Sequence, residues 1–238
     1  SISNPDLFIK HSSSLIKKGA KIAAIKSGSS ETGSRAASSH TGALTTPERV
    51  ISAIFKKAGI IRCFGRNDLV TVASILSKPL PKGNRVAVIT HAGGPAVMLT
   101  DILTSSGLTM PRFEGQKADL LLSKLGDGSS VTNPIDFLAT GTAEQLKSII
   151  DSCEKDFDID SIIIIFGSPG LTTVSDVYEL IISKQKSSKK PIYAIFPSLV
   201  NAKSEIEAFQ AKGGICYPDE VLFGEAFSKV LSNKGCIP

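Results

Sequence analysis

The sequence predicts an α/β protein in which helices cover both faces of a parallel sheet. Two observations carry this prediction. Short segments rich in β-branched residues alternate with helical patterns, and these short segments are apolar throughout, as strands buried on both faces are. Right-handed crossovers between such strands give a doubly wound sheet of the flavodoxin or the Rossmann type, and the alternation fits both types equally well.

Residues 84–238 are expected to form one complete domain. Its strands are predicted at 85–90, 161–166, 191–196 and 215–217. Its helices are predicted at 96–106, 118–125, 142–153, 174–183, 203–212 and 220–231, with Thr142 as the N-cap of the third. Between the first strand and the first helix, His91-Ala92-Gly93-Gly94-Pro95 is expected to form a glycine turn.

Residues 1–80 contain less sheet than an independent α/β domain needs. Helices are predicted at 6–18, 47–58 and 67–76, and strands at 21–26 and 60–63. We therefore expect the C-terminal part of a domain whose first strands precede Ser1. The stretch 77–84, with two prolines and a glycine, is the expected linker between the two parts.

The overall composition argues against several classes of protein. Basic residues are scattered and give a net charge of only +5, with 3 Tyr and no Trp, so nucleic-acid binding is not expected. The longest strongly apolar run, Ile162–Phe166, is far shorter than the ~20 residues of a membrane helix. Four cysteines without a CxxC pair argue against zinc and disulfide scaffolds, and favour reduced thiols in a cytoplasmic protein.

The segment Ser27–Leu44, SGSSETGSRAASSHTGAL, reads as a long loop of small residues. Long ordered loops are often functional, and this one holds His40 between Ser39 and Thr41-Gly42. A histidine here could be a general base, a metal ligand or a phosphoryl carrier. Metal is the weakest of these, because the other two histidines are not at ligand spacings. The alternative is a serine-rich surface loop in which the histidine has no function.

Two further segments could bind a ligand. Gly93 and Gly94, between a strand and a helix, could free backbone N–H groups for an anion, which the helix dipole would favour. The alternative is a tight turn that needs glycine for steric reasons alone. The turn Asn133-Pro134-Ile135-Asp136 could hold a ligand at a sheet edge, but a purely structural role such as helix capping is the favoured interpretation.

Taken together, the runs KSGSSETGSRAASSHTGAL, GNRVAVITHAGGPAVMLTDIL and NPIDF resemble the NDP-forming acyl-CoA synthetases. These belong to the succinyl-CoA synthetase superfamily and include the ADP-forming acetyl-CoA synthetases, whose alpha subunit this chain is similar to. The resemblance covers nearly the whole chain in order and spacing. It implies a flavodoxin-like domain at 84–238, preceded by the last part of a histidine-bearing flavodoxin-like domain at 1–80.

The resemblance also implies a mechanism and a site. Such enzymes interconvert acyl-CoA, phosphate and NDP with acid, CoA and NTP, and the histidine of the SHTG box, here His40, is transiently phosphorylated. The phosphate-binding residues would be Thr41 and Gly42 of this box together with the helix start Gly93, Gly94, Pro95 and Ala96. No resident metal is implied. One departure is His91, where the family usually has Asn; it either touches the phosphoryl group or is a tolerated substitution.

The resemblance places other parts of the enzyme outside this chain. A CoA-binding Rossmann domain, the glutamate that orients the histidine, and an ATP-grasp domain or subunit are expected there. Glu31 does not match that glutamate. Coenzyme A and ATP or ADP with Mg²⁺ would bind mainly to those parts, the complete enzyme is expected to be an oligomer, and this chain alone is expected to be inactive.

Two other functions remain open from the residues. One is a regulatory module that senses small molecules in a synthetase-like protein acetyltransferase; such modules often lack the box histidine, so the presence of His40 favours the enzyme. The other is a flavodoxin-like binding domain with no chemistry of its own. The acid that is activated, and the choice between ADP and GDP, are not encoded in any motif found here.

Overall fold

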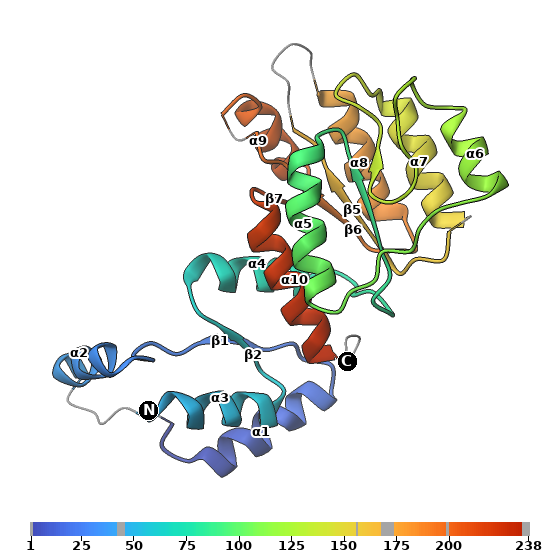
Figure 1. Ribbon diagram of the computed structural model, residues 1–238. Helices are drawn as coiled ribbons and strands as arrows, with labels where there is room; N and C mark the ends of the chain where they lie inside the picture. The colour runs from blue at the N-terminus through green and yellow to red at the C-terminus, as the bar shows by residue number, and fades with distance from the viewer. Residues whose placement is uncertain (1, 42–45, 156, 168–173, 199, 235–238) are drawn as a thin grey trace. The chain divides into compact units, whose positions relative to one another are not determined.

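The computed structural model describes residues 2–41, 46–155, 157–167, 174–198 and 200–234 (Figure 1). The chain divides into two compact units, Ser1–Ser77 and Lys78–Pro238. Every helix and strand expected from the periodicity is present, with ends displaced by a few residues, and two elements were not expected. All paired strands named below are parallel.

Unit 1 packs helices against a two-stranded sheet. Its elements are α1 (Pro5–Lys17), β1 (Ala23–Ile25), α2 (Glu31–Thr41), α3 (Glu48–Ala58), β2 (Ile61–Cys63) and α4 (Arg66–Leu76). Ala23 of β1 pairs with Ile61 of β2. Phe8 of α1 stacks on Phe55 of α3 with ring centroids 6.1 Å apart, and this contact belongs to a small core that also buries Ile51.

The sequence predicted a loop for the whole serine-rich segment. This prediction is wrong for residues Glu31–Thr41, which form helix α2. Two local interactions explain the helix. The hydroxyl of Ser30 accepts a hydrogen bond from the backbone N–H of Gly33 (3.1 Å), as an N-cap does. Arg35 pairs with Glu31 one turn earlier (2.7 Å). These two signals were missed because most of the surrounding residues are small and typical of loops. No residue of α2 whose side chain is described is buried.

Unit 2 contains a five-stranded parallel sheet. The strands are β3 (Val86–Thr90), β4 (Ile135–Asp136), β5 (Ser161–Ile165), β6 (Ile192–Ile195) and β7 (Cys216–Tyr217), in the order β4-β3-β5-β6-β7. Numbered within the unit, this order is 2-1-3-4-5, which is the flavodoxin order. The structure therefore decides between the two folds that the alternation had left open.

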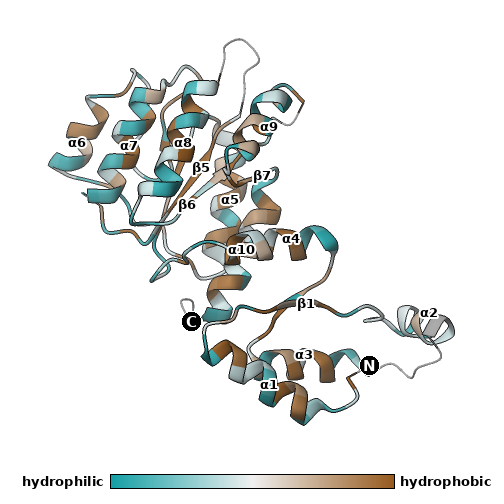
Figure 2. Ribbon diagram, turned by 180° about the vertical axis from the view of Figure 1, so that it is seen from behind, coloured by the Kyte–Doolittle hydropathy of each residue, from teal (hydrophilic) through white to brown (hydrophobic). Residues whose placement is uncertain are grey.

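Helices cover both faces of this sheet. On one face α5 (Gly93–Ser105) packs along α10 (Glu220–Lys234). The other face carries α6 (Gln116–Leu122), α7 (Ala143–Lys155), α8 (Ser175–Ser187) and α9 (Lys203–Ala211), as Figure 1 shows. Every residue of β3 and β5 is buried, and in Figure 2 β5 is hydrophobic along its length while the covering helices show polar and apolar stripes. This agrees with strands that are apolar throughout.

Strand β4 was missed because it has only two residues and lies in the Asn-Pro-x-Asp turn. The amide of Asn133 explains how so short a strand is held. Its Oδ1 accepts from the N–H of Val88 (3.0 Å), and its Nδ2 donates to the carbonyls of Val86 (2.9 Å) and Pro111 (3.0 Å). The side chain thus continues the ladder along β3 beyond the end of β4. A structural role was the favoured prediction for the turn, and Asn133 has such a role. Its side chain bonds to strand β3 instead of capping a helix.

No described helix combines the length and the apolar character that crossing a membrane requires.

The N-cap predicted at Thr142 is confirmed. Its hydroxyl accepts from the N–H of Gln145 (3.2 Å), and the Gln145 side chain accepts from the N–H of Thr142 (3.0 Å). This reciprocal pair is a capping box at the start of α7.

Candidate anion site at the carboxyl ends of the strands

The carboxyl ends of β3, β4 and β5 meet at one edge of the unit 2 sheet. Strand order reverses between β3 and β5, and ligands of doubly wound sheets bind in the crevice outside the strand ends at such a point. The chain leaves β3 through His91 and Ala92 into α5, and it leaves β5 through Phe166 and Gly167. The predicted glycine segment therefore lies at the switch point.

Helix α5 begins at Gly93, three residues earlier than predicted, so both glycines belong to its first turn. No side chain caps this helix start, and its first turn contains no acidic residue. The first backbone N–H groups of a helix have no partner within the helix, so those of Gly93 and Gly94 are available to an anion. Pro95 has no N–H to lose at this position, while Ala96 is buried against the core.

The structure also tests whether Gly93 and Gly94 are glycine for steric reasons. Neither has a positive φ. A Cβ placed on Gly94 would meet nothing within 4 Å, and one on Gly93 would meet only Asp136 Oδ2, at 4.0 Å. The turn itself therefore does not demand glycine at either position. Glycine leaves the N–H groups uncovered, which is the property that close approach of a ligand needs.

His91 bridges the ends of β3 and β5. Its Nε2 lies 2.5 Å from the carbonyl oxygen of Gly167, and its ring stacks on Phe166 with centroids 4.3 Å apart. The side chain is buried, and burial lowers the pKa of the imidazole, against the opposing effects of the Gly167 hydrogen bond and the Asp136 carboxylate. The role of His91 could not be decided from the sequence, because no local pattern marks its partner Gly167, two residues after the end of β5.

Asp136 joins the site from the end of β4. Its Oδ1 accepts a hydrogen bond from the N–H of Leu138 (2.9 Å), and its Oδ2 faces the position of Gly93. This carboxylate was not among the predicted site residues. The Asn-Pro-x-Asp turn that contains it had been noted, and the adjacency of β3 and β4 is what brings it to α5.

The histidine box lies in the other unit. His40 and Thr41 form the C-terminal end of α2, while Gly42 falls outside the described residues. The two halves of the predicted phosphate site therefore belong to different units, Thr41 to unit 1 and the start of α5 to unit 2. The roles of these residues stay predictions at this point.

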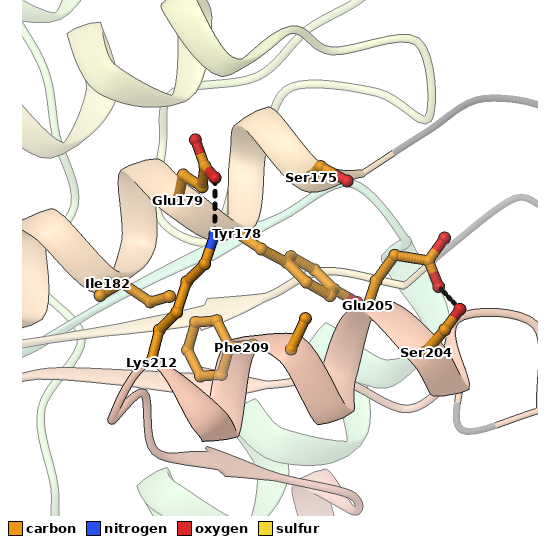
Figure 3. A pocket seen from close by; sticks show the side chains of 9 residues that line it. Ser175, Tyr178, Glu179, Ile182, Ser204, Glu205, Phe209 and Lys212 are labelled. Carbon is orange, nitrogen blue, oxygen red and sulfur yellow. Dashed lines mark hydrogen bonds and ion pairs between the residues drawn. The ribbon is translucent and has the colours of Figure 1, made fainter.

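A groove of about 280 Å³ between α8 and α9 contains none of the predicted site residues (Figure 3). Tyr178 and Phe209 form apolar parts of its wall, and Lys212 pairs with Glu179 across it at 2.8 Å. Burial raises the pKa of Tyr178, so its hydroxyl stays protonated. The carboxylate of Glu205 accepts a hydrogen bond from the hydroxyl of Ser204 (2.7 Å), so each charged side chain among these lining residues already has a partner. Across the described part of the chain, no cluster of three or more His, Cys, Asp or Glu residues is placed to hold a metal ion.

Known proteins provide an independent comparison. Residues 1–76 match the family described as succinyl-CoA ligase like flavodoxin domain. The alpha subunit of acetate–CoA ligase (ADP-forming) II of Pyrococcus furiosus is 32% identical over 212 residues, which are 87% of this chain and 46% of that subunit. The 4-hydroxybutyrate–CoA ligase (ADP-forming) of Nitrosopumilus maritimus is 28% identical over 88% of this chain and 30% of its own length.

A solved structure supports the fold. The dinucleotide-forming acetyl-coenzyme A synthetase 1 of Candidatus Korarchaeum cryptofilum, in complex with phosphate and ADP, superposes with a TM-score of 0.87. It is 22% identical, and the match covers 99% of this chain and 51% of that one. The chain thus spans about half the length of the Pyrococcus alpha subunit and of this synthetase chain, and less than a third of the 4-hydroxybutyrate–CoA ligase. It is similar to the alpha subunits of ADP-forming acetate–CoA ligases, and its residues 1–76 match the family described as succinyl-CoA ligase like flavodoxin domain.

Proposed function

We propose that this chain is part of an NDP-forming acyl-CoA synthetase that interconverts acyl-CoA, phosphate and NDP with acid, CoA and NTP. The observation that carries the proposal is the uncapped start of α5, whose exposed Gly93 and Gly94 lie at the switch point of a flavodoxin-order sheet. The ADP-forming CoA ligases to which the chain is similar support the same reaction class.

In this proposal His40 carries the phosphoryl group. A ring nitrogen of His40 attacks the γ-phosphorus of NTP, so that the N–P bond forms while the bond from that phosphorus to NDP breaks and NDP leaves; in the opposite direction the N–P bond breaks as NDP takes the phosphoryl group and NTP is formed. Thr41 and Gly42 adjoin the phosphorylated ring. The backbone N–H groups at the start of α5 hold the phosphoryl oxygens, with a dipole contribution on the order of 0.3–2 kcal/mol.

The remaining chemistry belongs to other parts of the enzyme. We propose that coenzyme A binds to a Rossmann domain, and ATP or ADP with Mg²⁺ to an ATP-grasp domain or subunit, in a complete enzyme that is oligomeric and cytoplasmic. The Mg²⁺ would bind together with the nucleotide in that part of the enzyme. These 238 residues alone would therefore show no turnover.

Phosphorylation of the complete enzyme tests the proposal. With γ-labelled NTP and Mg²⁺, we expect an acid-labile, base-stable label that disappears in His40→Asn. His11→Asn is the matched control, because His11 is an exposed histidine of α1 far from the box in sequence. A label that persists in His40→Asn, or no label in the unmodified complete enzyme, would refute the phosphohistidine role.

A further inference from the structure

The hydrogen bond between His91 and Gly167 determines which ring nitrogen of His91 is free. A carbonyl oxygen can only accept, so Nε2 of His91 carries the proton in the 2.5 Å contact with Gly167. In the neutral ring, Nδ1 is then an acceptor without a proton. Nδ1 is buried, and it has no hydrogen-bond partner among the residues that the structure describes. Because His91 is only 8% exposed, bulk water does not replace that partner.

Few charged groups near His91 influence whether its imidazole is protonated. Phe166 and Phe137 pack near the ring, with centroids 4.3 and 6.4 Å away. The carboxylate of Asp136 on β4 is the charged group that acts on His91 within the described part of the chain, and it favours the imidazolium. The described residues that follow β5 contribute the Gly167 carbonyl and no charged group, and the first turn of α5 adds no acidic side chain.

The same carboxylate bears on any anion at α5. Asp136 Oδ2 is 4.0 Å from the place where a Cβ of Gly93 would stand, so it lies beside the N–H groups that would hold a phosphoryl dianion. Two like charges so close disfavour each other. A proton on His91, on which Asp136 acts, would offset the charge of this carboxylate, and the unpartnered Nδ1 is the buried position that can accept it.

We propose that the start of α5 binds a phosphoryl dianion together with one proton, which His91 takes up at Nδ1 from solvent. Asp136 then faces an imidazolium as well as the dianion, and the Nε2–H bond to Gly167 is kept in both protonation states. This inference rests on the proposed anion site and adds to it two residues that act through charge: His91, which takes up the proton, and Asp136, whose negative charge that proton offsets. Release of the anion returns the proton to solvent.

Sulfate is a suitable probe, because it is a dianion that does not itself titrate near neutral pH. The chain has 3 histidines, so their Cε1–H proton resonances can be followed individually over a pH titration of the full 238 residues. We expect the apparent pKa of His91 to rise by about half a pH unit or more in sulfate relative to chloride at equal ionic strength. The resonance of the exposed His11, recorded in the same samples, should show no difference between the two salts.

Variants assign the signals and test the role of Asp136. His91→Asn or His91→Gln should remove one resonance; if either fails to fold, His11→Gln and His40→Gln assign the same signal by elimination. In Asp136→Asn the titration of His91 in chloride should move to lower pH, because the carboxylate that favours the imidazolium is gone. Asp127→Asn, a change on the exposed surface of the same unit, should leave it unchanged.

Three outcomes would overturn the inference. Equal titration of His91 in both salts excludes proton uptake with the anion, even if sulfate shifts the amide resonances of Gly93 and Gly94. An equal shift of all three histidines means ionic screening or an adventitious ion only. A rise that persists in Asp136→Asn at its full size removes Asp136 from the site. None of these results affects the labelling of His40 in the complete enzyme, which decides the proposed function separately.

Discussion

Burial of His91 makes the stability of unit 2 depend on pH. The folded protein lowers the pKa of His91, mainly because the charged ring loses its hydration, whereas the unfolded chain titrates near 6.5. Below that pH the unfolded state therefore binds more protons than the folded state. The stability present above pH 6.5 is then lost progressively as the pH falls toward the folded pKa of His91.

Urea unfolding at pH 7.5, 6.5 and 5.5 measures this effect. As the pH is lowered, we expect the free energy of unfolding of unit 2 to decrease. The contribution of His91 to this decrease should be at most about 1.4 kcal/mol per pH unit. His91→Asn should remove that part of the dependence, and His11→Asn should retain it. If His91→Asn and the unmodified chain lose stability in parallel, His91 is not the titrating group.

Helix α2 shows how an element can form without a core to support it. None of its described side chains is buried, and its sequence is mostly Ser, Thr, Gly and Ala. Its support comes instead from the Ser30 cap and the pair of Glu31 with Arg35. An exposed pair of this kind contributes only a few tenths of a kcal/mol, so the cap is the larger local interaction.

Removing the cap should therefore destabilise α2 selectively. We expect Ser30→Ala to cost about 1 kcal/mol of local helix stability and to increase backbone amide exchange across Glu31–Ser39, with little change in global unfolding. Ser39→Ala is the matched control, because its hydroxyl only donates to the carbonyl of Ala36 (2.9 Å) near the other end of the helix. Equal exchange in the two variants would show that the cap does not hold α2.

At the scale of the whole molecule, the two units differ in charge and in core. Residues 1–77 hold 11 basic and 4 acidic residues, whereas residues 78–238 hold 16 basic and 18 acidic ones. The modest net charge of +5 thus conceals a unit of +7 and a unit of −2. Unit 1 has a small core around Ile51 and Phe55, and unit 2 has the larger core of a five-stranded sheet.

Separate cores predict separate responses to core mutations. All three tyrosines, Tyr178, Tyr193 and Tyr217, lie in unit 2 and the chain has no Trp, so tyrosine fluorescence reports on unit 2 alone. Far-ultraviolet circular dichroism reports on both units. We expect Ile51→Ala, a change at a fully buried position, to cost about 2–5 kcal/mol and to shift only the dichroism transition in urea.

Ile149→Ala, at an equally buried position of α7, should shift the tyrosine transition together with the part of the dichroism change that comes from unit 2. If Ile51→Ala moves the tyrosine transition as far as Ile149→Ala does, the units unfold as one. Such a result would contradict the expectation drawn from their separate cores.

The sequence by itself determined the features that depend on local signals. Continuous apolar runs showed the strands, helical spacing showed the helices, and the Thr142–Gln145 pair marked the start of α7, because neighbours along the chain determine each of these. Gly93 and Gly94 were recognised in the same way, because they lie directly between an apolar run and a helical pattern. Helix α2 escaped because its cap and ion pair are weak signals within a segment whose composition is typical of loops.

Only the tertiary structure decided what distant segments do together. The strand order separated a flavodoxin-like sheet from a Rossmann one, and Asn133, two residues before β4, bonds to β3 across 45 residues of sequence. The contact of His91 with Gly167 spans 76 residues. No local pattern encodes such contacts, since parallel strands become neighbours only after the crossover helices pack, and it is this packing that brings His91, Asp136 and the start of α5 to one edge of the sheet.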